Sequence, residues 1–255
     1  MEVHGDQESP KVTSPDLYVV EKRLRKCFGQ PRHGNKSNPL DELLYILLSL
    51  QTTQTNCQRS YRSLRRTFPR WSLLAKASQS EIRKPINFAG FGRQRAHKIA
   101  AIARRIHRDN GCVSLSRLKK LSSEQAERYL TSLPGVGKKT ARCVLMYSLD
   151  RAVFPLDTHC ARILKRLGFD IPNGSLRKCE DRIQDLIPPE IRYSLHVTMI
   201  VLGRNICTSK RPKCNTCPLL SLCPTGQIIA DSQISQLARR SAENDGSGDD
   251  YKIPA

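Results

Sequence analysis

Four cysteines near the carboxyl end constrain the fold of this chain more than any other feature. They are spaced C-x6-C-x2-C-x5-C, at Cys207, Cys214, Cys217 and Cys223. Thiolates this close in sequence can hold one metal centre, and the segment between them must then fold around it. Zinc and an iron–sulfur cluster both use four thiolates. Structural zinc usually draws on two short C-x2-C pairs, whereas this set contains one such pair.

The loop between the first two cysteines carries a second signal. Its three cations, Lys210, Arg211 and Lys213, lie on the arc between two ligands of the expected metal centre. An arc folded onto a fixed scaffold would preset these cations for contact with phosphate, which supplies affinity without reading a base sequence.

The net charge points to a polyanionic partner. The chain of 255 residues has a formal net charge of +20, with −3 on residues 1–16, −2 on residues 224–255 and therefore +25 on residues 17–223. A field of this size attracts polyanions and makes their binding salt-dependent. We therefore predict nucleic acid as the partner, in preference to a basic surface that serves only solubility.

The chain shows no sign of a membrane segment. Its longest apolar run, residues 43–50, is eight residues long and includes a serine, which is far short of a membrane span. The acidic, polar amino terminus shows no export or transit pattern, so we expect a reducing compartment: the cytoplasm, near the nucleoid, of a prokaryote, or the nucleus of a eukaryote. Six cysteines lack ligand spacing and are expected to stay reduced: Cys27, Cys57, Cys112, Cys143, Cys160 and Cys179.

Helix signals recur from residue 16 to residue 206 and strand-like alternation is hard to find, so the predicted fold class is all-α. Asn38 and Pro39 predict a cap and first-turn proline ahead of an apolar, buried helix. Ser78 with Glu81, and Ser122 with Gln125, fit the capping box. Further helices are predicted over 54–67, 93–109, 138–149, 158–167, 175–186 and 189–205.

A glycine-containing turn between two predicted helices is a candidate phosphate site. Gly135, Val136 and Gly137 lie in the sequence LPGVGKKTA, and the glycines allow backbone conformations that direct successive amides outward. The following helix, which begins near Lys138, adds positive dipole to this turn. The alternative is an ordinary glycine cap at the end of the preceding helix. We favour the phosphate site because a cap explains one glycine but not two.

Asp157, in the sequence FPLDTH, precedes the helix predicted to begin at Thr158. Its position is that of an N-cap, a structural role. Amides and the helix dipole would also keep its carboxylate ionised, so that it could stabilise positive charge developing nearby. Spacing alone does not decide between these roles.

Taken together, LPGVGKKTA at 133–141, FPLDTH at 154–159 and the cysteine spacing resemble endonuclease III, one of the helix-hairpin-helix DNA glycosylases. The resemblance covers residues 16–224. It implies two all-α domains flanking a DNA-binding cleft: a six-helix barrel with the helix-hairpin-helix at 33–151, and an iron–sulfur cluster domain made of 16–32 and 152–223. Residues 1–15 and 224–255 are polar and poor in apolar residues, and we expect both to be flexible tails. We expect a monomer.

The resemblance also assigns roles to single residues. The family's catalytic lysine falls on Lys139, with Lys138 in the preceding basic position, and its catalytic aspartate falls on Asp157. A damaged base must leave the stack before it can be cut out. Gln51 matches the residue that fills the gap, and Phe91 is a second candidate wedge, although a lone aromatic is more often core.

The implied chemistry is that of a bifunctional glycosylase and AP lyase. The neutral Lys139 amine attacks the sugar C1′, the base leaves, and the resulting Schiff base leads to strand cleavage by β-elimination. The amine must first lose its proton, which desolvation and the neighbouring charge of Lys138 would favour. The partner is double-stranded DNA with damaged bases or abasic sites. The implied cofactor is a 4Fe-4S cluster held by the four cysteines, in a structural role.

Two positions depart from the family pattern near the expected pocket. Gln54 stands where an aspartate is common, and Thr131 stands where a glutamate can occur. The resemblance makes an oxidised pyrimidine the leading candidate substrate, and these two departures leave the preferred damaged base open. The alternatives are a monofunctional glycosylase for mismatched or alkylated bases, which Lys139 argues against, and a non-catalytic helix-hairpin-helix DNA-binding module, which Lys139 and Asp157 together argue against.

Overall fold

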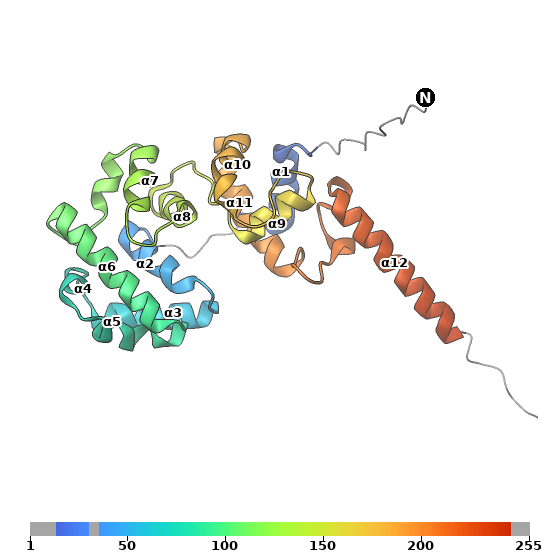
Figure 1. Cartoon of the computed structure of the whole chain (residues 1–255). Helices are drawn as coiled ribbons and strands as arrows, with labels where there is room; N and C mark the ends of the chain where they lie inside the picture. Colours follow the sequence, from blue (N-terminus) through green and yellow to red (C-terminus); the bar gives the residue numbers. More distant parts are fainter. Residues whose placement is uncertain (1–13, 31–35, 246–255) are drawn as a thin grey trace, which may run out of the picture. The chain divides into compact units, whose positions relative to one another are not determined.

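The computed structural model describes residues 14–30 and 36–245, and within these ranges every regular element is a helix (Figure 1). The all-α prediction is confirmed for this part of the chain. The prediction of a flexible amino-terminal tail concerns residues of which 1–13 lie outside the described ranges. No helix of the described residues is long and apolar enough to cross a membrane.

The chain divides into two compact units. Unit 1 contains Met1–Pro31, Thr158–Gly174 and Val197–Ala255, and unit 2 contains Arg32–Asp157 and Ser175–His196. The helix α11, Arg192–Asn205, crosses the division. Each unit is described by itself below.

Unit 2 is a bundle of amphipathic helices around one hydrophobic core. In α2, Pro39–Ser49, apolar residues are buried along the length of the helix, and α2 packs against α3, Gln54–Thr67, and α8, Lys138–Leu149. The long helix α6, Gly92–Asn110, covers the short helices α4, Ser72–Lys76, and α5, Gln79–Ile86. The helix α7, Ser123–Thr131, packs on α8.

The capping signals read from the sequence are confirmed. Asn38 accepts hydrogen bonds from the amides of Leu40 and Asp41 at the start of α2. Ser78 and Ser122 form complete capping boxes with Glu81 and Gln125 at the starts of α5 and α7. Because these caps satisfy amides that a helix leaves without partners, they fix where each helix begins.

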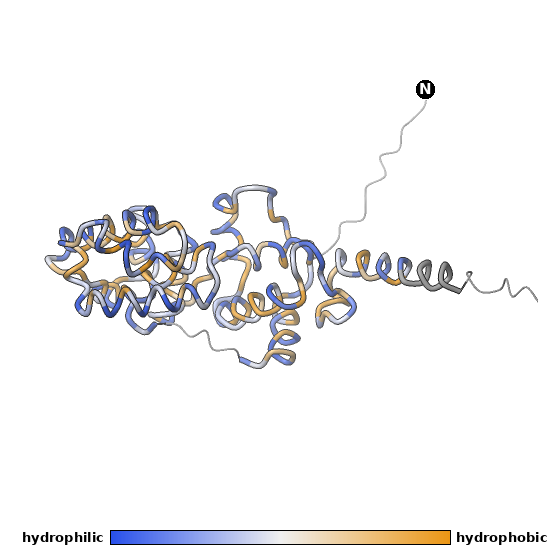
Figure 2. The backbone as a smooth tube through the Cα atoms, turned by 90° about the horizontal axis from the view of Figure 1, so that it is seen from below, coloured by the Kyte–Doolittle hydropathy of each residue, from blue (hydrophilic) through white to orange (hydrophobic). Residues whose placement is uncertain are grey.

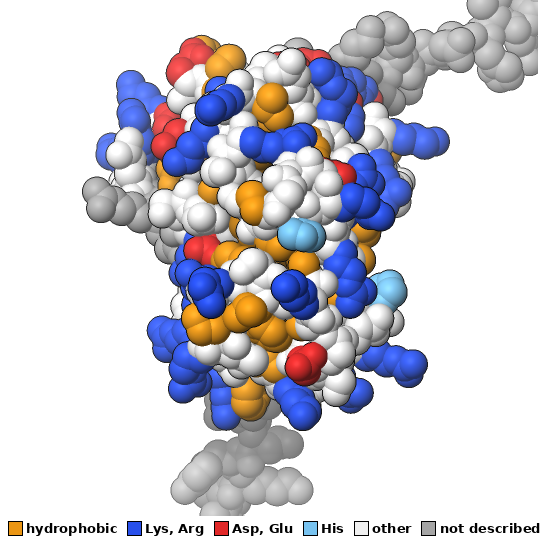
Figure 3. All heavy atoms as spheres, turned by 90° about the vertical axis from the view of Figure 1, so that its left-hand side faces the viewer, with side chains coloured by type: hydrophobic (Ala, Val, Ile, Leu, Met, Phe, Trp, Pro, Cys, Tyr) orange, Lys and Arg blue, Asp and Glu red, His pale blue; other side chains and the backbone are white. Residues whose placement is uncertain are grey.

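The surface of unit 2 is strongly basic. Along its helices, hydrophobic and hydrophilic stretches alternate (Figure 2), so that polar side chains remain for the outer faces. On the face shown in Figure 3, Lys and Arg side chains gather around a small apolar area, with few acidic side chains among them. This is the field that the net charge of the chain predicted.

The boundary between the units differs from the predicted domain boundary. Residues 152–157 and 175–196 were assigned to the cluster domain, but they belong to unit 2. Buried Arg142 on α8 donates to the backbone oxygen of Glu180 at 2.9 Å, and His196 contacts the Tyr147 hydroxyl at 2.8 Å. These contacts attach α10, Glu180–Leu186, and the start of α11 to the barrel.

Unit 1 contains α1, Leu17–Phe28, α9, Thr158–Arg166, the carboxyl-terminal part of α11, the cysteine segment and α12, Pro224–Asp245. The prediction of a flexible tail from residue 224 is wrong for residues 224–245, which form α12. Ala230 of this helix is buried, and Gln233 donates to the backbone oxygen of Pro212 at 3.2 Å. Packing on the cysteine segment therefore stabilises a helix whose own composition is polar.

Candidate active site and cysteine pocket

The turn before α8 places one glycine where glycine is needed. Gly135 has φ +70°, in the left-handed region, and a Cβ there would lie 2.6 Å from Cε of Lys98. Gly137 is different: its backbone is extended, with φ −92°, and a Cβ would meet no atom within 4 Å. Of the two glycines, only Gly135 therefore has the left-handed backbone conformation that favours glycine. At Gly137 the missing side chain leaves open space beside the first amides of α8.

An ion-pair network holds the first turn of α8. Lys138 pairs with Asp181, and Arg142, which is 2% exposed, pairs with Asp181 and with Glu127 at 2.8 Å. The hydrogen bond from the Lys138 ammonium lowers the pKa of the Asp181 carboxyl. Lys138 is thus partly neutralised in this structure, so its charge acts on Lys139 less than its sequence position suggested.

Lys139 and Asp157 act on the same buried thiol. Cys143 lies one turn after Lys139 on α8, and burial raises the pKa of its thiol to about 11. The charge of Lys139 and a side-chain hydrogen bond with Lys139 lower that pKa, while the charge of Asp157 raises it. The amine and the carboxylate are therefore both within electrostatic range of Cys143. Both residues are partly exposed, so a ligand can reach them.

Contacts with α10 and α11 fix the segment that carries Asp157. The Phe154 amide donates to Oε1 of Gln184 at 2.9 Å, and the buried Phe154 ring lies edge-on to the His196 ring, 5.5 Å away. Arg192 donates to the backbone oxygen of Ala152. These bonds reach α10 and α11, which explains why residues 152–157 belong to unit 2.

A second carboxylate, that of Glu42 on α2, also interacts with Lys139 and Cys143. It is 1% exposed and accepts a hydrogen bond from the Lys36 amide at 2.8 Å. Burial raises the pKa of Glu42 to about 7, against the opposing effects of that bond and of the charges on Lys36 and Lys139. Its charge also raises the pKa of Cys143. Sequence reasoning missed this residue, although a glutamate directly before the apolar run 43–50 was a visible signal.

The two candidate wedge residues share a pocket and a rare backbone conformation. Gln51 and Phe91 both have φ 50°, in the left-handed region, which is unusual for residues with side chains. Both are exposed, and both line a pocket with Arg95 and Lys98 of α6. Because left-handed backbone at such residues is strained, it is retained where surrounding contacts enforce it.

Arg95 supplies those contacts. The residue is 8% exposed, and its guanidinium donates to the backbone oxygens of Leu48 at 2.9 Å, Ala89 at 2.8 Å and Leu50. One side chain thus ties the segment before Gln51 to the turn before Phe91. Among many cations in the sequence, nothing distinguished Arg95.

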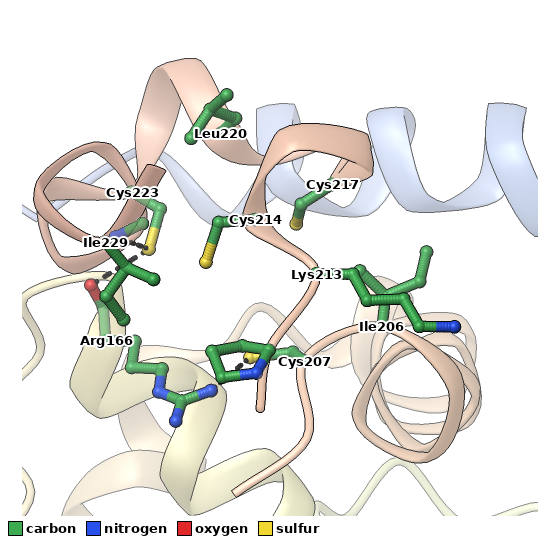
Figure 4. A pocket seen from close by; sticks show the side chains of 11 residues that line it. Arg166, Ile206, Cys207, Lys213, Cys214, Cys217, Leu220, Cys223 and Ile229 are labelled. Atoms are coloured by element: carbon green, nitrogen blue, oxygen red, sulfur yellow. Dashed lines mark hydrogen bonds between the residues drawn. The ribbon is translucent and has the colours of Figure 1, made fainter. Parts of the chain in front are cut away.

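The four cysteines line one pocket in unit 1, as predicted from their spacing. Figure 4 shows their side chains around a common hollow, with the Arg166 guanidinium beside Cys207. Arg166 donates to Sγ of Cys207 at 3.1 Å, and the Gly226 amide donates to Sγ of Cys223 at 3.2 Å. Burial raises the pKa of Cys217 to about 11. Among the described residues, no three His, Cys, Asp or Glu side chains come close enough to hold a single metal ion.

The cationic loop between the first two cysteines is anchored from α9. Arg166 donates to the backbone oxygens of Thr208 at 2.8 Å and Ser209 at 3.2 Å, and Arg162 donates to that of Cys207 at 3.0 Å. The predicted phosphate contacts of this loop all have exposed side chains: Lys210, Arg211 and Lys213. The loop is thus fixed at its backbone and leaves its charges accessible.

The two positions that depart from the family pattern offer no hidden carboxylate. Gln54 is exposed at the first position of α3, after its cap Thr53. The Thr131 hydroxyl donates to the backbone oxygen of Glu127 at 2.8 Å, within α7. Both positions therefore differ chemically from the acidic residues they replace.

The fold and the motifs define a class of protein. Residues 44–189 match the family model of the HhH-GPD superfamily base excision DNA repair protein, and this chain belongs to that family. Within the family it is similar to endonuclease III of Bacillus subtilis (strain 168), with 30% identity over 191 residues that cover 75% of this chain and 83% of the relative.

Other relatives extend these likenesses. The Arabidopsis thaliana protein At3g47830 is 35% identical over 170 residues, which cover 67% of this chain and 58% of that protein. The chain thus spans little more than half the length of this relative. Two solved structures of endonuclease III with DNA, a non-covalent complex and a trapped covalent intermediate, are 26% and 27% identical. Both have a TM-score of 0.71 and cover 84% of this chain and 97% of the matched chains.

Proposed function

We propose that this protein is a bifunctional DNA glycosylase and AP lyase of base excision repair, acting on double-stranded DNA. The observation that carries the proposal is the shared environment of Lys139 and Asp157 at Cys143. A nucleophilic amine and a carboxylate that act on the same buried thiol are the two groups that this chemistry needs.

The reaction follows from these positions. The neutral Lys139 amine forms a bond to the sugar C1′ as the bond from C1′ to the base breaks, and the base leaves with its electron pair and takes up a proton. Ionised Asp157 stabilises the positive charge that develops on the sugar. The bond from C1′ to the ring oxygen O4′ then breaks, O4′ takes up the proton that the amine releases, and the opened sugar is held as a Schiff base. Removal of a C2′ proton finally expels the 3′ phosphate by β-elimination.

The extrusion of the base is assigned to the pocket at Gln51 and Phe91. A nucleotide that leaves the stack must be replaced, and an exposed aromatic wedge with a hydrogen-bonding side chain beside it suits that task. Arg95 holds both backbones in position before DNA arrives. Because binding then orders little further, the wedge loses little entropy on binding.

We propose an oxidised pyrimidine as the damaged base. Support comes from the likeness to endonuclease III together with Lys139, which fits lyase chemistry. Gln54 and Thr131 replace acidic side chains with groups that both donate and accept hydrogen bonds. A glycosylase panel of thymine glycol, alkylated adenine and a thymine mismatch would test this proposal. Release of thymine glycol alone supports it, and release of only the other two contradicts it.

We propose that the four cysteines hold a 4Fe-4S cluster. A single zinc with bonds of about 2.3 Å would bring the sulfurs within roughly 4 Å of one another. The apolar lining of the pocket and the amide and guanidinium donors to sulfur suit an iron–sulfur centre. The cluster would fix the loop of Lys210, Arg211 and Lys213 for contact with phosphate. Metal and acid-labile sulfide analysis should find iron and sulfide; zinc without sulfide would contradict the proposal.

Covalent trapping tests the catalytic proposal. Protein in excess is mixed with duplex DNA that contains an abasic site or thymine glycol, in the presence of borohydride, which reduces a Schiff base to a stable adduct. We expect an adduct with the natural protein and with Lys138→Ala, but not with Lys139→Ala. Asp157→Asn should keep its DNA affinity and lose base excision. DNA binding without any adduct would instead indicate a non-catalytic module.

A further inference from the structure

A buried carboxylate next to the catalytic group has no role in the chemistry above. Glu42 is 1% exposed and accepts a hydrogen bond from a backbone amide, that of Lys36, at 2.8 Å. A neutral glutamine could accept the same bond without the cost of burying a charge. An ionisable group at this position therefore calls for an explanation beyond packing.

The surroundings of Glu42 come from three segments. Lys36, before α2, lies over the Tyr45 and Tyr61 rings with its Nζ 5.1 Å from each centroid, so its charge is also shared with these rings. Burial raises the pKa of each of these tyrosines and of Cys57 on α3, and the charge of Glu42 adds to each rise. The carboxyl group of Glu42 is thus coupled to groups on α2 and α3.

The third segment is α8, which packs directly on α2. Glu42 interacts there with the charge of Lys139 and with Cys143, and Asp157 acts on the same Cys143. The charge of Lys139 is thus coupled to Glu42 and to Cys143 across the packed helices α2 and α8. The pKa of Glu42, about 7, lies in the physiological range.

We propose that Glu42 is a positioning residue that acts on Lys139: from the facing helix α2, its carboxyl group controls how readily the Lys139 amine loses its proton. This inference rests on the proposed function. Ionised Glu42 stabilises the ammonium form of Lys139, which cannot attack the sugar, whereas protonated Glu42 does not. Glu42 therefore makes the supply of neutral amine less dependent on pH near neutrality.

The direction of the pH effect follows from the protonation equilibria of Glu42 and Lys139, which are linked. Below pH 7, Glu42 is mostly protonated, and the fraction of neutral amine rises tenfold per pH unit. Above pH 7, Glu42 becomes ionised and holds the proton on Lys139, so the rise flattens. Glu42→Gln stays neutral throughout, and its adduct formation should keep rising with pH.

The experiment is single-turnover trapping of an abasic-site duplex with cyanoborohydride, which is usable from pH 6 to pH 8.5. The ratio of the Glu42→Gln rate to the natural rate should be near one at pH 6 and about tenfold at pH 8.5, for two interacting charges on the packed helices α2 and α8. Glu42→Asp retains the charge and should again show a flattened profile. Its use keeps the test decisive should the glutamine variant fold poorly.

A matched control separates charge from packing. Glu21→Gln changes a glutamate that is 6% exposed in unit 1, where it pairs with Arg25, and its rate ratio should not vary with pH. A ratio for Glu42→Gln that is constant across the pH range would overturn the inference and leave Glu42 a packing residue. Absence of an adduct from the natural protein at every pH would instead overturn the proposed function, and this inference with it.

Discussion

Arg95→Met should destabilise unit 2 more than the replacement of an exposed arginine would, because Arg95 is buried. Methionine keeps much of the aliphatic stem, so the main loss is that of three charge-assisted hydrogen bonds. Two of the accepting carbonyls belong to the buried residues Leu48 and Ala89, whereas Leu50 is exposed and can bond to water instead. At about 1.5 kcal/mol for each buried carbonyl, unfolding becomes easier by about 3 kcal/mol.

The assay is urea and thermal unfolding, with Arg104→Met as the matched control. Arg104 lies on the same helix but is exposed, and its bonds to the oxygens of Ala75 and Ala77 are longer, at 3.3 and 3.1 Å. We expect a loss of about 1 kcal/mol or less for the control. For Arg95→Met, the midpoint should fall by roughly 6 to 12 °C. Equal losses in the two variants would refute the assignment of Arg95 as the anchor of the wedge.

Three further outcomes follow from the structure. Gly135→Ala should lower the free energy of unfolding in urea by about 1 to 3 kcal/mol, because φ of Gly135 is +70° and a Cβ there would meet Lys98. Gly137→Ala, the control, should unfold like the natural protein. Equal losses in the two variants would contradict this prediction. Replacing Lys210, Arg211 and Lys213 by alanine should reduce the slope of log affinity against log salt by up to about 3 without changing the unfolding midpoint; an unchanged slope would exclude phosphate contact by this loop. Since the folded-state pKa of Glu42 is raised to about 7 from 4.5, its protonated form is favoured in the folded state, and its contribution to stability is lost as pH rises from 4.5 through 7. Glu42→Gln should therefore gain stability relative to the natural protein, by on the order of 3 kcal/mol, between pH 4.5 and pH 8 in urea titrations; a constant difference would contradict the shift.

The sequence predicted helix ends well where they depend only on neighbouring residues. The α8 bounds, 138–149, and the capping boxes at Ser78 and Ser122 depend on neighbouring residues, and the structure has them as predicted. The start of α10 was placed five residues too early, because a short 3-10 turn, Leu176–Lys178, precedes it. The helix α12 was missed because its stability depends on packing against the cysteine segment rather than on its own composition.

The residues that complete the site were not predictable from spacing. Arg95, Arg142 and Arg166 each bond to groups far away in the sequence, and a guanidinium that anchors backbone looks, in sequence, like one that binds DNA. Arg95 and Arg142 are also buried next to apolar residues, as is Glu42, whereas Arg166 is only half-buried. A charged residue directly before an apolar helical run is the signal that could have identified Glu42 and Arg142.

The central claim is that the Lys139 amine bonds to the sugar of the extruded nucleotide. Mass spectrometry of the borohydride-trapped adduct, after digestion of protein and DNA, locates that bond directly. The account predicts a sugar remnant on Lys139, with none on Lys138 or on Lys98 nearby. A remnant on another residue, or an unmodified Lys139 peptide in a trapped sample, would contradict it.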